Sequence, residues 1–218
     1  MRYAVYLTPP KDSPLAAAAE AWLGRSAFTG AAAPAEAPAG ALAHVPARYG
    51  FHATMRAPFR LAAGATEGDL LAAFGAHAAA HPPLAVALKL GRLHNFLALL
   101  AEDAGPVAEA ERLILHAFEP LRAPLTREER ARRDPDRLDA VGRALLDRWG
   151  YPHVLERFTF HMTLTGPMDP ADVDAVEAAA KARFGPLLGE PLTLVHALFR
   201  EDAPGGPFHV IASQDARP

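Results

Sequence analysis

Two matching strings of residues lie half a chain apart in this sequence, and both alternate in the manner of β-strands. Residues 51–55 are Phe-His-Ala-Thr-Met and residues 160–164 are Phe-His-Met-Thr-Leu. The composition gives about 0.4 His-x-Thr triplets by chance, whereas two occur, each with Phe before it and a large apolar residue after it. Because successive side chains of a strand point to opposite faces, each string predicts a strand with an apolar core face and a polar face that carries imidazole beside hydroxyl.

The alternation assigns particular side chains to the polar face of each strand. The first strand, predicted over 49–55, presents Gly50, His52 and Thr54 on this face, followed by Arg56. The second strand, predicted over 158–165, presents Thr159, His161, Thr163 and Thr165. If both polar faces border one cleft, two histidines and two threonines converge there.

This set of side chains suits phosphodiester chemistry without a metal. A neutral imidazole accepts a proton from the attacking water or hydroxyl, and an imidazolium protonates the leaving oxygen. His titrates near about 6.5, so His52 and His161 can hold opposite protonation states near neutrality. The hydroxyls of Thr54 and Thr163 would donate hydrogen bonds to the non-bridging phosphate oxygens. Arg56 would be a further anion clamp. The near-symmetric pair leaves open which histidine is the base.

The triplets have two other interpretations, a structural role and a metal site. Threonine favours strands, and a lone inward histidine is more often a hydrogen-bonded structural residue. The matched context of the two copies favours function over that interpretation. A metal site is disfavoured, because neither His52 nor His161 has another His, Asp or Glu two residues away in its strand.

The rest of the chain alternates between strand and helix patterns. Further strands are expected at 2–8, 84–90, 96–100, 192–198 and 208–213, with a hairpin around Gly91-Arg92. Helices are expected at 15–24, capped by Ser13-Pro14, at 66–80, capped by Thr66 and Asp69, and at 107–118, 136–149 and 171–184. Residues 30–40 are of low complexity and predict a mobile surface loop. The order of elements predicts an α+β or α/β domain with antiparallel or mixed sheets.

Composition excludes several classes of protein. The chain has 22 Lys and Arg against 25 Asp and Glu, and it has no Cys. A disulfide scaffold, a thiolate nucleophile and a Cys-ligated metal site are therefore excluded. The acidic balance disfavours an extended nucleic-acid partner. The apolar stretch at 3–7 is too short for a signal peptide and no long apolar run occurs, so we expect a cytoplasmic protein without a membrane partner.

The paired motifs resemble the two-histidine (2H) phosphoesterase superfamily. The similarity to its branch of phosphonate metabolism proteins extends over nearly the whole chain. It is carried by residues 2–6, 21–25, 48–59, 122–125, 148–152 and 160–166. Arg56 stands where that branch often has lysine, so the charge is kept.

The resemblance implies a fold and a set of site residues. The implied fold is α+β and bilobal: residues 1–218 form a single domain of two antiparallel sheets with flanking helices, related by a pseudo-twofold axis through one cleft. The implied catalytic residues are His52, Thr54, His161 and Thr163. The substrate-binding residues expected around them are Arg56, Tyr3, Thr165, Tyr151 and Arg122, the last two on resemblance alone.

The expected function is the hydrolysis of a small cyclic phosphodiester, without cofactor or metal, by a monomer. The resemblance to phosphonate metabolism proteins suggests a ribosyl cyclic phosphate as the substrate. The alternatives are a 2′,3′-cyclic nucleotide or RNA-end phosphodiesterase and a non-catalytic nucleotide- or phosphosugar-binding protein. The stretch 127–134 mixes charges of both signs, which is typical of a solvated helix face. A lid that brings an arginine to a second phosphate is the alternative for that stretch.

Overall fold

A computed structural model describes residues 1–32 and 40–215. Its strands form an eight-stranded antiparallel sheet in the order β3-β7-β1-β2-β6-β5-β4, and β8 pairs with β7 beside this path. The strands are β1 (Arg2–Thr8), β2 (Ala53–Phe59), β3 (Leu84–Val86), β4 (Leu88–Leu93), β5 (Phe96–Ala101), β6 (His161–Thr163), β7 (Leu192–Glu201) and β8 (Phe208–Ser213). The protein is therefore α+β, as predicted.

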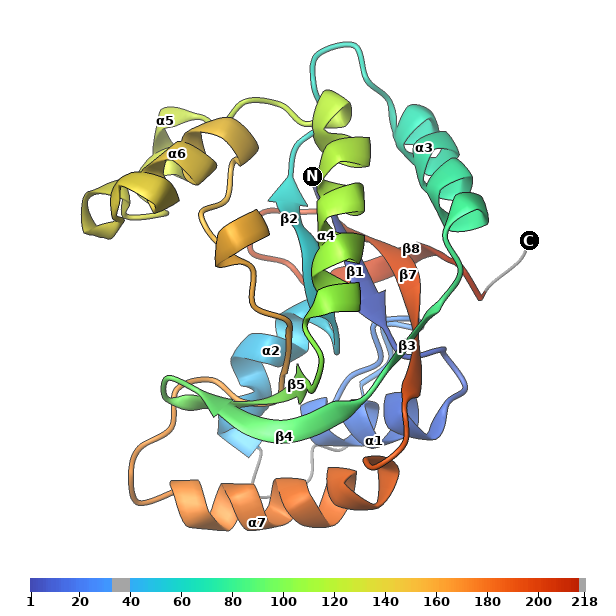
Figure 1. The fold of residues 1–218 in the computed structure, drawn as a ribbon, viewed down its shortest axis with the longest axis vertical. Helices are drawn as coiled ribbons and strands as arrows, with labels where there is room; N and C mark the ends of the chain where they lie inside the picture. Colours follow the sequence, from blue (N-terminus) through green and yellow to red (C-terminus); the bar gives the residue numbers. More distant parts are fainter. Residues whose placement is uncertain (33–39, 216–218) are drawn as a thin grey trace.

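Seven α-helices flank this sheet within the described residues. They are α1 (Pro14–Leu23), α2 (His44–Tyr49), α3 (Glu67–Ala80), α4 (Gly105–Phe118), α5 (Arg127–Ala131), α6 (Ala140–Trp149) and α7 (Val173–Phe184). Short 3₁₀ turns are η1 (Gly40–Ala43), η2 (Glu119–Leu121), η3 (Pro135–Arg137), η4 (Leu155–Arg157) and η5 (Gly185–Leu187). Figure 1 shows α4 across β1 and β2, α1 and α7 at the opposite end near β4, and α5 with α6 projecting to one side. None of the described helices is long and apolar enough to cross a membrane.

The helix boundaries follow local signals that the sequence carries. The Ser13 hydroxyl accepts a hydrogen bond from the Ala16 N–H at the start of α1, and Gly24 ends that helix at φ 72°. Thr66 and Asp69 form the predicted capping box of α3. These contacts lie within one turn of each helix end, so they can be predicted without knowledge of the tertiary structure.

Two predicted boundaries are wrong because pairing partners decide them. The expected strand at 49–55 is interrupted, since Tyr49 ends α2 and β2 begins at Ala53. The β4–β5 hairpin turns after Leu93, which pairs with Phe96, and not at Gly91, which pairs with Ala98 inside the ladder. Most of the loop predicted at 30–40 lies outside the described residues.

The expectation of two separate sheets is also wrong. One residue pair, Ala53 with Met162, joins β2 to β6 and makes the sheet continuous. A free strand edge exposes unpaired N–H and C=O groups, and this pairing satisfies part of each edge. The two segments β3-β7-β1-β2 and β6-β5-β4 therefore meet at a single contact between the two His-x-Thr strings.

The main core lies on the sheet face that both strings cover with apolar side chains. Met55 and Met162 are about 1% or less exposed and pack in one cluster with Ile114 and Phe118 of α4 and Phe184 of α7. The predicted division of each string into an apolar and a polar face is confirmed on this side. A smaller cluster of Ala4, Tyr6, Ala197, Phe199 and Phe208 occupies the other face of β1 and β7.

Candidate active site

The Ala53–Met162 pair relates the two triplets by a local two-fold axis. Each of these residues is the middle member of its His-x-Thr triplet, and the strands are antiparallel. In the antiparallel register, His52 therefore lies across from Thr163, and Thr54 lies across from His161. Because the two middle residues are buried in the core, the four polar side chains lie on the opposite face of the sheet.

Both histidines are held in the same way by the backbone. The Nδ1 of His52 lies 2.9 Å from the carbonyl oxygen of Gly50, and the Nδ1 of His161 lies 2.8 Å from that of Thr159. A carbonyl oxygen only accepts, so Nδ1 carries the proton in each ring and Nε2 is left for chemistry. The Nε2 of His52 lies 3.2 Å from the Thr54 hydroxyl oxygen.

The surroundings of His52 favour its neutral form. Tyr6 stacks on the imidazole at 3.8 Å between ring centroids, and Phe199 lies 6.3 Å away. Burial lowers the pKa of His52 to about 4, the Gly50 carbonyl opposes this shift, and the charge of His161 adds to it. His52 is therefore neutral at pH 7, and its Nε2 lone pair accepts a hydrogen bond from the Thr54 hydroxyl.

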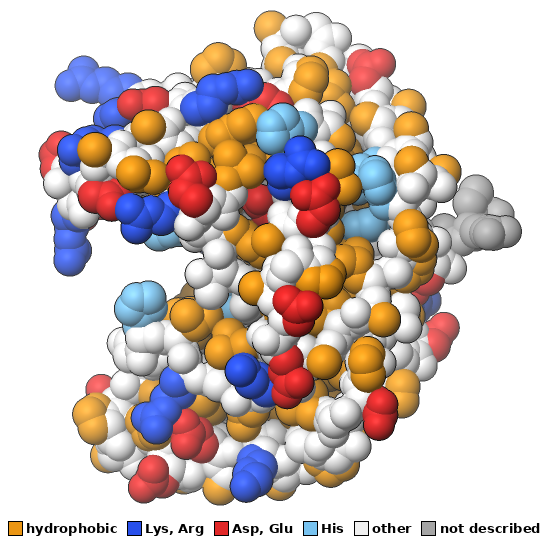
Figure 2. All heavy atoms as spheres, viewed as in Figure 1, with side chains coloured by type: hydrophobic (Ala, Val, Ile, Leu, Met, Phe, Trp, Pro, Cys, Tyr) orange, Lys and Arg blue, Asp and Glu red, His pale blue; other side chains and the backbone are white. Residues whose placement is uncertain are grey.

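A cavity of about 610 Å³ opens over these side chains. His52, Thr54 and Thr163 line it, whereas His161 is not among its lining residues. Figure 2 shows the molecule hollowed beside the surface of α5 and α6, where arginine side chains gather. The described residues that line the cavity include seven arginines and one carboxylate, Glu129; the arginines are Arg2, Arg48, Arg56, Arg60, Arg122, Arg132 and Arg133. This lining favours an anionic ligand.

Arg56 lies in this lining, in a different setting from the one predicted. Pairing of β1 with β2 steps from Tyr6–Thr54 to Val5–Arg56, a bulge that interrupts the simple alternation past Thr54. The Arg56 side chain is 2% exposed and ion-paired with Glu119. Its charge is thus shared with a carboxylate of the protein.

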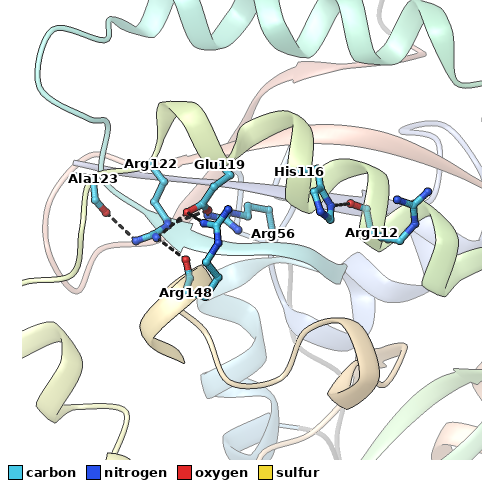
Figure 3. A network of polar contacts seen from close by, with 7 residues as sticks. All are labelled: Arg56, Arg112, His116, Glu119, Arg122, Ala123 and Arg148. Atoms are coloured by element: carbon cyan, nitrogen blue, oxygen red, sulfur yellow. Dashed lines mark hydrogen bonds and ion pairs between the residues drawn. The ribbon is translucent and has the colours of Figure 1, made fainter. Parts of the chain in front are cut away.

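The carboxylate of Glu119 forms ion pairs with three guanidinium groups (Figure 3). It contacts Arg56, Arg122 at 2.8 Å and Arg148 at 3.1 Å. Burial acts to raise the pKa of Glu119, but the hydrogen bond from Arg122 and the charge of Arg56 outweigh it and hold that pKa below its usual value. Arg122 also donates to the carbonyls of Ala123 and Arg148, which orients its guanidinium at the cavity wall.

The remaining predicted binding residues divide into two groups. Tyr151 and Arg122 line the cavity, as the resemblance implies. Tyr3 and Thr165 are not among its lining residues and have structural partners. The Tyr3 hydroxyl donates to Glu67, and the fully buried Thr165 hydroxyl accepts from the Leu97 N–H. Tyr3 is an odd number of residues from Tyr6, so the two rings lie on opposite faces of β1.

Sequence reasoning missed two tyrosines, Tyr6 and Tyr49, and three arginines, Arg2, Arg48 and Arg60, of the described cavity lining. Tyr6 pairs with Thr54 across β1 and β2, and Arg48 lies over the Tyr49 ring at 5.1 Å. Only strand pairing brings Tyr6 to the site, so no local signal identifies it. The string Arg-Tyr-Gly-Phe-His that precedes the first triplet is the feature from which Arg48 and Tyr49 could have been found.

No group of three or more His, Cys, Asp or Glu side chains within residues 1–32 and 40–215 is arranged to hold a metal ion. The chemistry at the described site is that of two imidazoles, hydroxyls and guanidinium groups. This set moves protons and stabilises anions.

Comparison with known proteins gives two related sequences and a family. One relative, from Janthinobacterium sp. (strain Marseille), is named ribose 1,5-bisphosphate phosphokinase PhnN; it is 38% identical over 95% of this chain and 49% of its own length. A second, from Laribacter hongkongensis (strain HLHK9), has the same name and is 36% identical over 96% of this chain and 50% of its own length. The chain thus spans about half the length of these curated relatives. Residues 54–209 match a family, so the chain belongs to the family described as protein of unknown function (DUF1045).

Proposed function

We propose that this protein is a metal-independent phosphoesterase that opens a small cyclic phosphodiester by acid–base catalysis. The observation that carries the proposal is the two-fold arrangement of the His-x-Thr triplets around the Ala53–Met162 pair, with both Nδ1 atoms held by backbone carbonyls. Binding alone does not require two proton-transfer groups placed in this way. The arrangement agrees with a 2H phosphoesterase in which two lobes are related by a pseudo-twofold axis.

The half-buried position of His52 against Tyr6 supports its assignment as the base. Neutral His52 takes a proton from water through Nε2 while the water oxygen forms a bond to phosphorus. The bond from phosphorus to one ring oxygen breaks, and His161 in its protonated form supplies the proton that this oxygen needs. The hydroxyls of Thr54 and Thr163 donate to the non-bridging oxygens. One water is consumed and a phosphomonoester with a free hydroxyl is formed.

The names of the relatives bear on the substrate. This chain matches half of each relative, and none of its three lysines follows a glycine, so it lacks the Gly-x₄-Gly-Lys-Ser/Thr motif of a P-loop kinase. We assign the phosphokinase activity of those proteins to their other half. Opening a ribosyl 1,2-cyclic phosphate that carries a 5-phosphate yields ribose 1,5-bisphosphate, the compound in the relatives' name. Such a step places this chain in phosphonate catabolism.

The test is a panel of cyclic phosphodiesters followed by phosphorus NMR in excess EDTA. The panel holds ribose 1,2-cyclic phosphate 5-phosphate and the four 2′,3′-cyclic nucleotides. We expect one member to be opened without divalent metal. His52→Ala and His161→Ala should each lower turnover by about 10²–10⁴-fold. Near-normal turnover in both variants, or activity that EDTA removes and a divalent ion restores, would contradict the proposal.

A further inference from the structure

The cavity extends from His52 and Thr54 along β2 to a second, arginine-rich end. Its wall there is made by the end of β2, by the segment after η2 and by α5, with Arg56, Arg122 and Arg133 among the lining residues. The segment after η2 is tied to the end of β2 by backbone pairing of Leu61 with Arg122 and by the Ala123 N–H, which donates to the Arg60 carbonyl at 2.8 Å. We call Arg56, Arg122 and Arg133 the arginine subsite.

This end of the cavity carries more positive charge than its own carboxylates neutralise. In the cavity wall, Arg56 and Arg122 share the single carboxylate of Glu119, which leaves one positive charge in excess. Arg148 also contacts Glu119, but it is largely exposed and is not among the lining residues. Burial lowers the pKa of Arg56 only to about 10, so it remains charged. An uncompensated charge excess at a partly buried position is costly unless an anion completes it.

Arg56 has an unused donor in this cluster. Its side chain is 98% buried, and among the described residues its Nη1 has no hydrogen-bond partner. The nearby carboxyl of Glu111 does not supply one: its Oε1 is also without a partner, and burial raises the pKa of Glu111 to about 7, against the opposing effects of the Leu155 N–H and the Arg56 charge. Glu111 is therefore only partly ionised near neutrality.

Arg133 adds a second unneutralised charge from the projecting α5–α6 region. No ion pair joins it to a carboxylate among the described residues, and its guanidinium lies over the Tyr151 ring at 4.9 Å. Arg60 differs, because Glu129 binds it at 2.8 Å and the Pro124 carbonyl accepts from it. Arg60 therefore adds no free charge at this end, and Arg132 donates to the Glu128 carbonyl.

We propose that the arginine subsite binds a phosphomonoester dianion on the same substrate whose cyclic diester lies between His52 and His161. This proposal rests on the proposed function and deepens it. The two negative charges of a phosphomonoester equal the two in excess when the three guanidinium groups of the arginine subsite are set against Glu119. Thr54 and Arg56 are two residues apart on β2, so their Cα atoms are at most about 7 Å apart even across the bulge, a separation that one small sugar spans. The substrate class is therefore a sugar with a cyclic phosphodiester and a separate phosphate group.

Kinetics on a matched substrate pair test the specificity. Adenosine 2′,3′-cyclic phosphate is compared with the same compound carrying a 5′-phosphate. The protein should favour the 5′-phosphorylated member by about 10- to 100-fold in kcat/KM, the range for charge-assisted hydrogen bonds. Arg122→Gln and Arg133→Gln should remove most of this preference. Arg112→Gln is the matched control, because Arg112 is half-exposed on α4, pairs with Glu109 and lies away from the cavity (Figure 3). Equal kcat/KM for the two substrates would overturn the proposal.

Calorimetry separates this proposal from the proposed function. Ribose 5-phosphate, with ribose as reference, is titrated into the His52→Ala variant, which lacks the proposed base. Tighter binding of ribose 5-phosphate, lost in His52→Ala/Arg133→Gln but kept in His52→Ala/Arg112→Gln, supports the subsite even if no diester is hydrolysed. Equal binding of the two sugars overturns the subsite even if hydrolysis is found. Arg133 has no ion pair to lose, so an unchanged melting temperature is expected for its variant and shows that the fold is intact.

Discussion

At the scale of single residues, the orientation of each imidazole depends on the backbone two residues before it. Gly50 supplies the carbonyl that holds His52, and it does so at φ 76° and ψ 175°. Side-chain-bearing residues rarely adopt this conformation. A Cβ on Gly50 would also lie 2.5 Å from the Cβ of Ala27. Glycine at this position is therefore needed both for the backbone conformation and for the orientation of the His52 ring.

Gly50→Ala tests this dependence. We expect its free energy of unfolding to fall by about 1–3 kcal/mol, because strain and the contact with Ala27 add together, and turnover to fall with it as His52 shifts. Gly64→Ala is the control, since Gly64 has a similar φ of 84° and open space around its Cβ position. Urea denaturation and turnover of both variants check the prediction. Equal losses of stability and full activity in both would show that Gly50 does not position His52.

At the scale of elements, α3 packs on β7 through a group of histidines. His77 is 7% and His196 is 1% exposed, with 5.0 Å between their ring centroids, and His81 lies 4.4 Å from His77. Burial lowers the pKa of both His77 and His196 to about 4, and neighbouring histidines add to the shift. The contact between these elements therefore requires neutral imidazoles.

This contact predicts a loss of stability in mild acid. The folded-state pKa values lie below the unfolded value of about 6.5, so the unfolded chain binds more protons between about pH 6.5 and 4. The stability contribution is complete above about pH 6.5 and is lost as the pH falls toward 4. Urea midpoints at pH 7 and pH 5 should differ less in His196→Leu than in the exposed-residue control His116→Gln. Equal differences in both variants would contradict the prediction.

At the scale of the whole molecule, the net charge of the chain is negative, whereas the charge of the cavity lining is positive. The chain carries a formal charge of −3, while seven arginines and one carboxylate line the cavity among the described residues. Attraction of an anionic ligand is therefore local to the cavity. It is screened by salt, because the Debye length of the solution falls from about 30 Å at 0.01 M to about 8 Å at 0.15 M ionic strength.

Ionic strength should consequently act on binding more than on chemistry. We expect KM for the cyclic phosphodiester to rise several-fold between about 0.01 and 0.15 M salt. The value of kcat should change little, because the reacting groups are shielded within the cavity. Steady-state kinetics at constant pH measure both, and potassium chloride and potassium acetate should act alike. A KM independent of salt would mean that the arginines do not attract the substrate.

Much of the fold was predictable from short-range patterns. The alternation at 51–55 and 160–164 predicted the buried Met55 and Met162, and the caps of α1 and α3 lie where Ser13 and Thr66 indicate. Pro14, Thr66 and Asp69 stabilise helix starts within one turn of their own positions. Along a strand, the side chains return to the same face every two residues. Such interactions depend on neighbours in the chain, so the sequence alone contains them.

Only the tertiary structure decided how these elements combine. It paired Ala53 with Met162 in one continuous sheet. It also stacked Tyr6, and not Tyr3, on the His52 ring, and it placed Arg56 in an ion pair with Glu119. Backbone hydrogen bonds between distant strands and a bulge in β2 determine these outcomes. The sequence by itself determined which side of each strand is apolar and which polar side chains alternate with that side. Strand pairing decided which of them meet, because register and edge pairing are properties of two segments together and leave no pattern in either one.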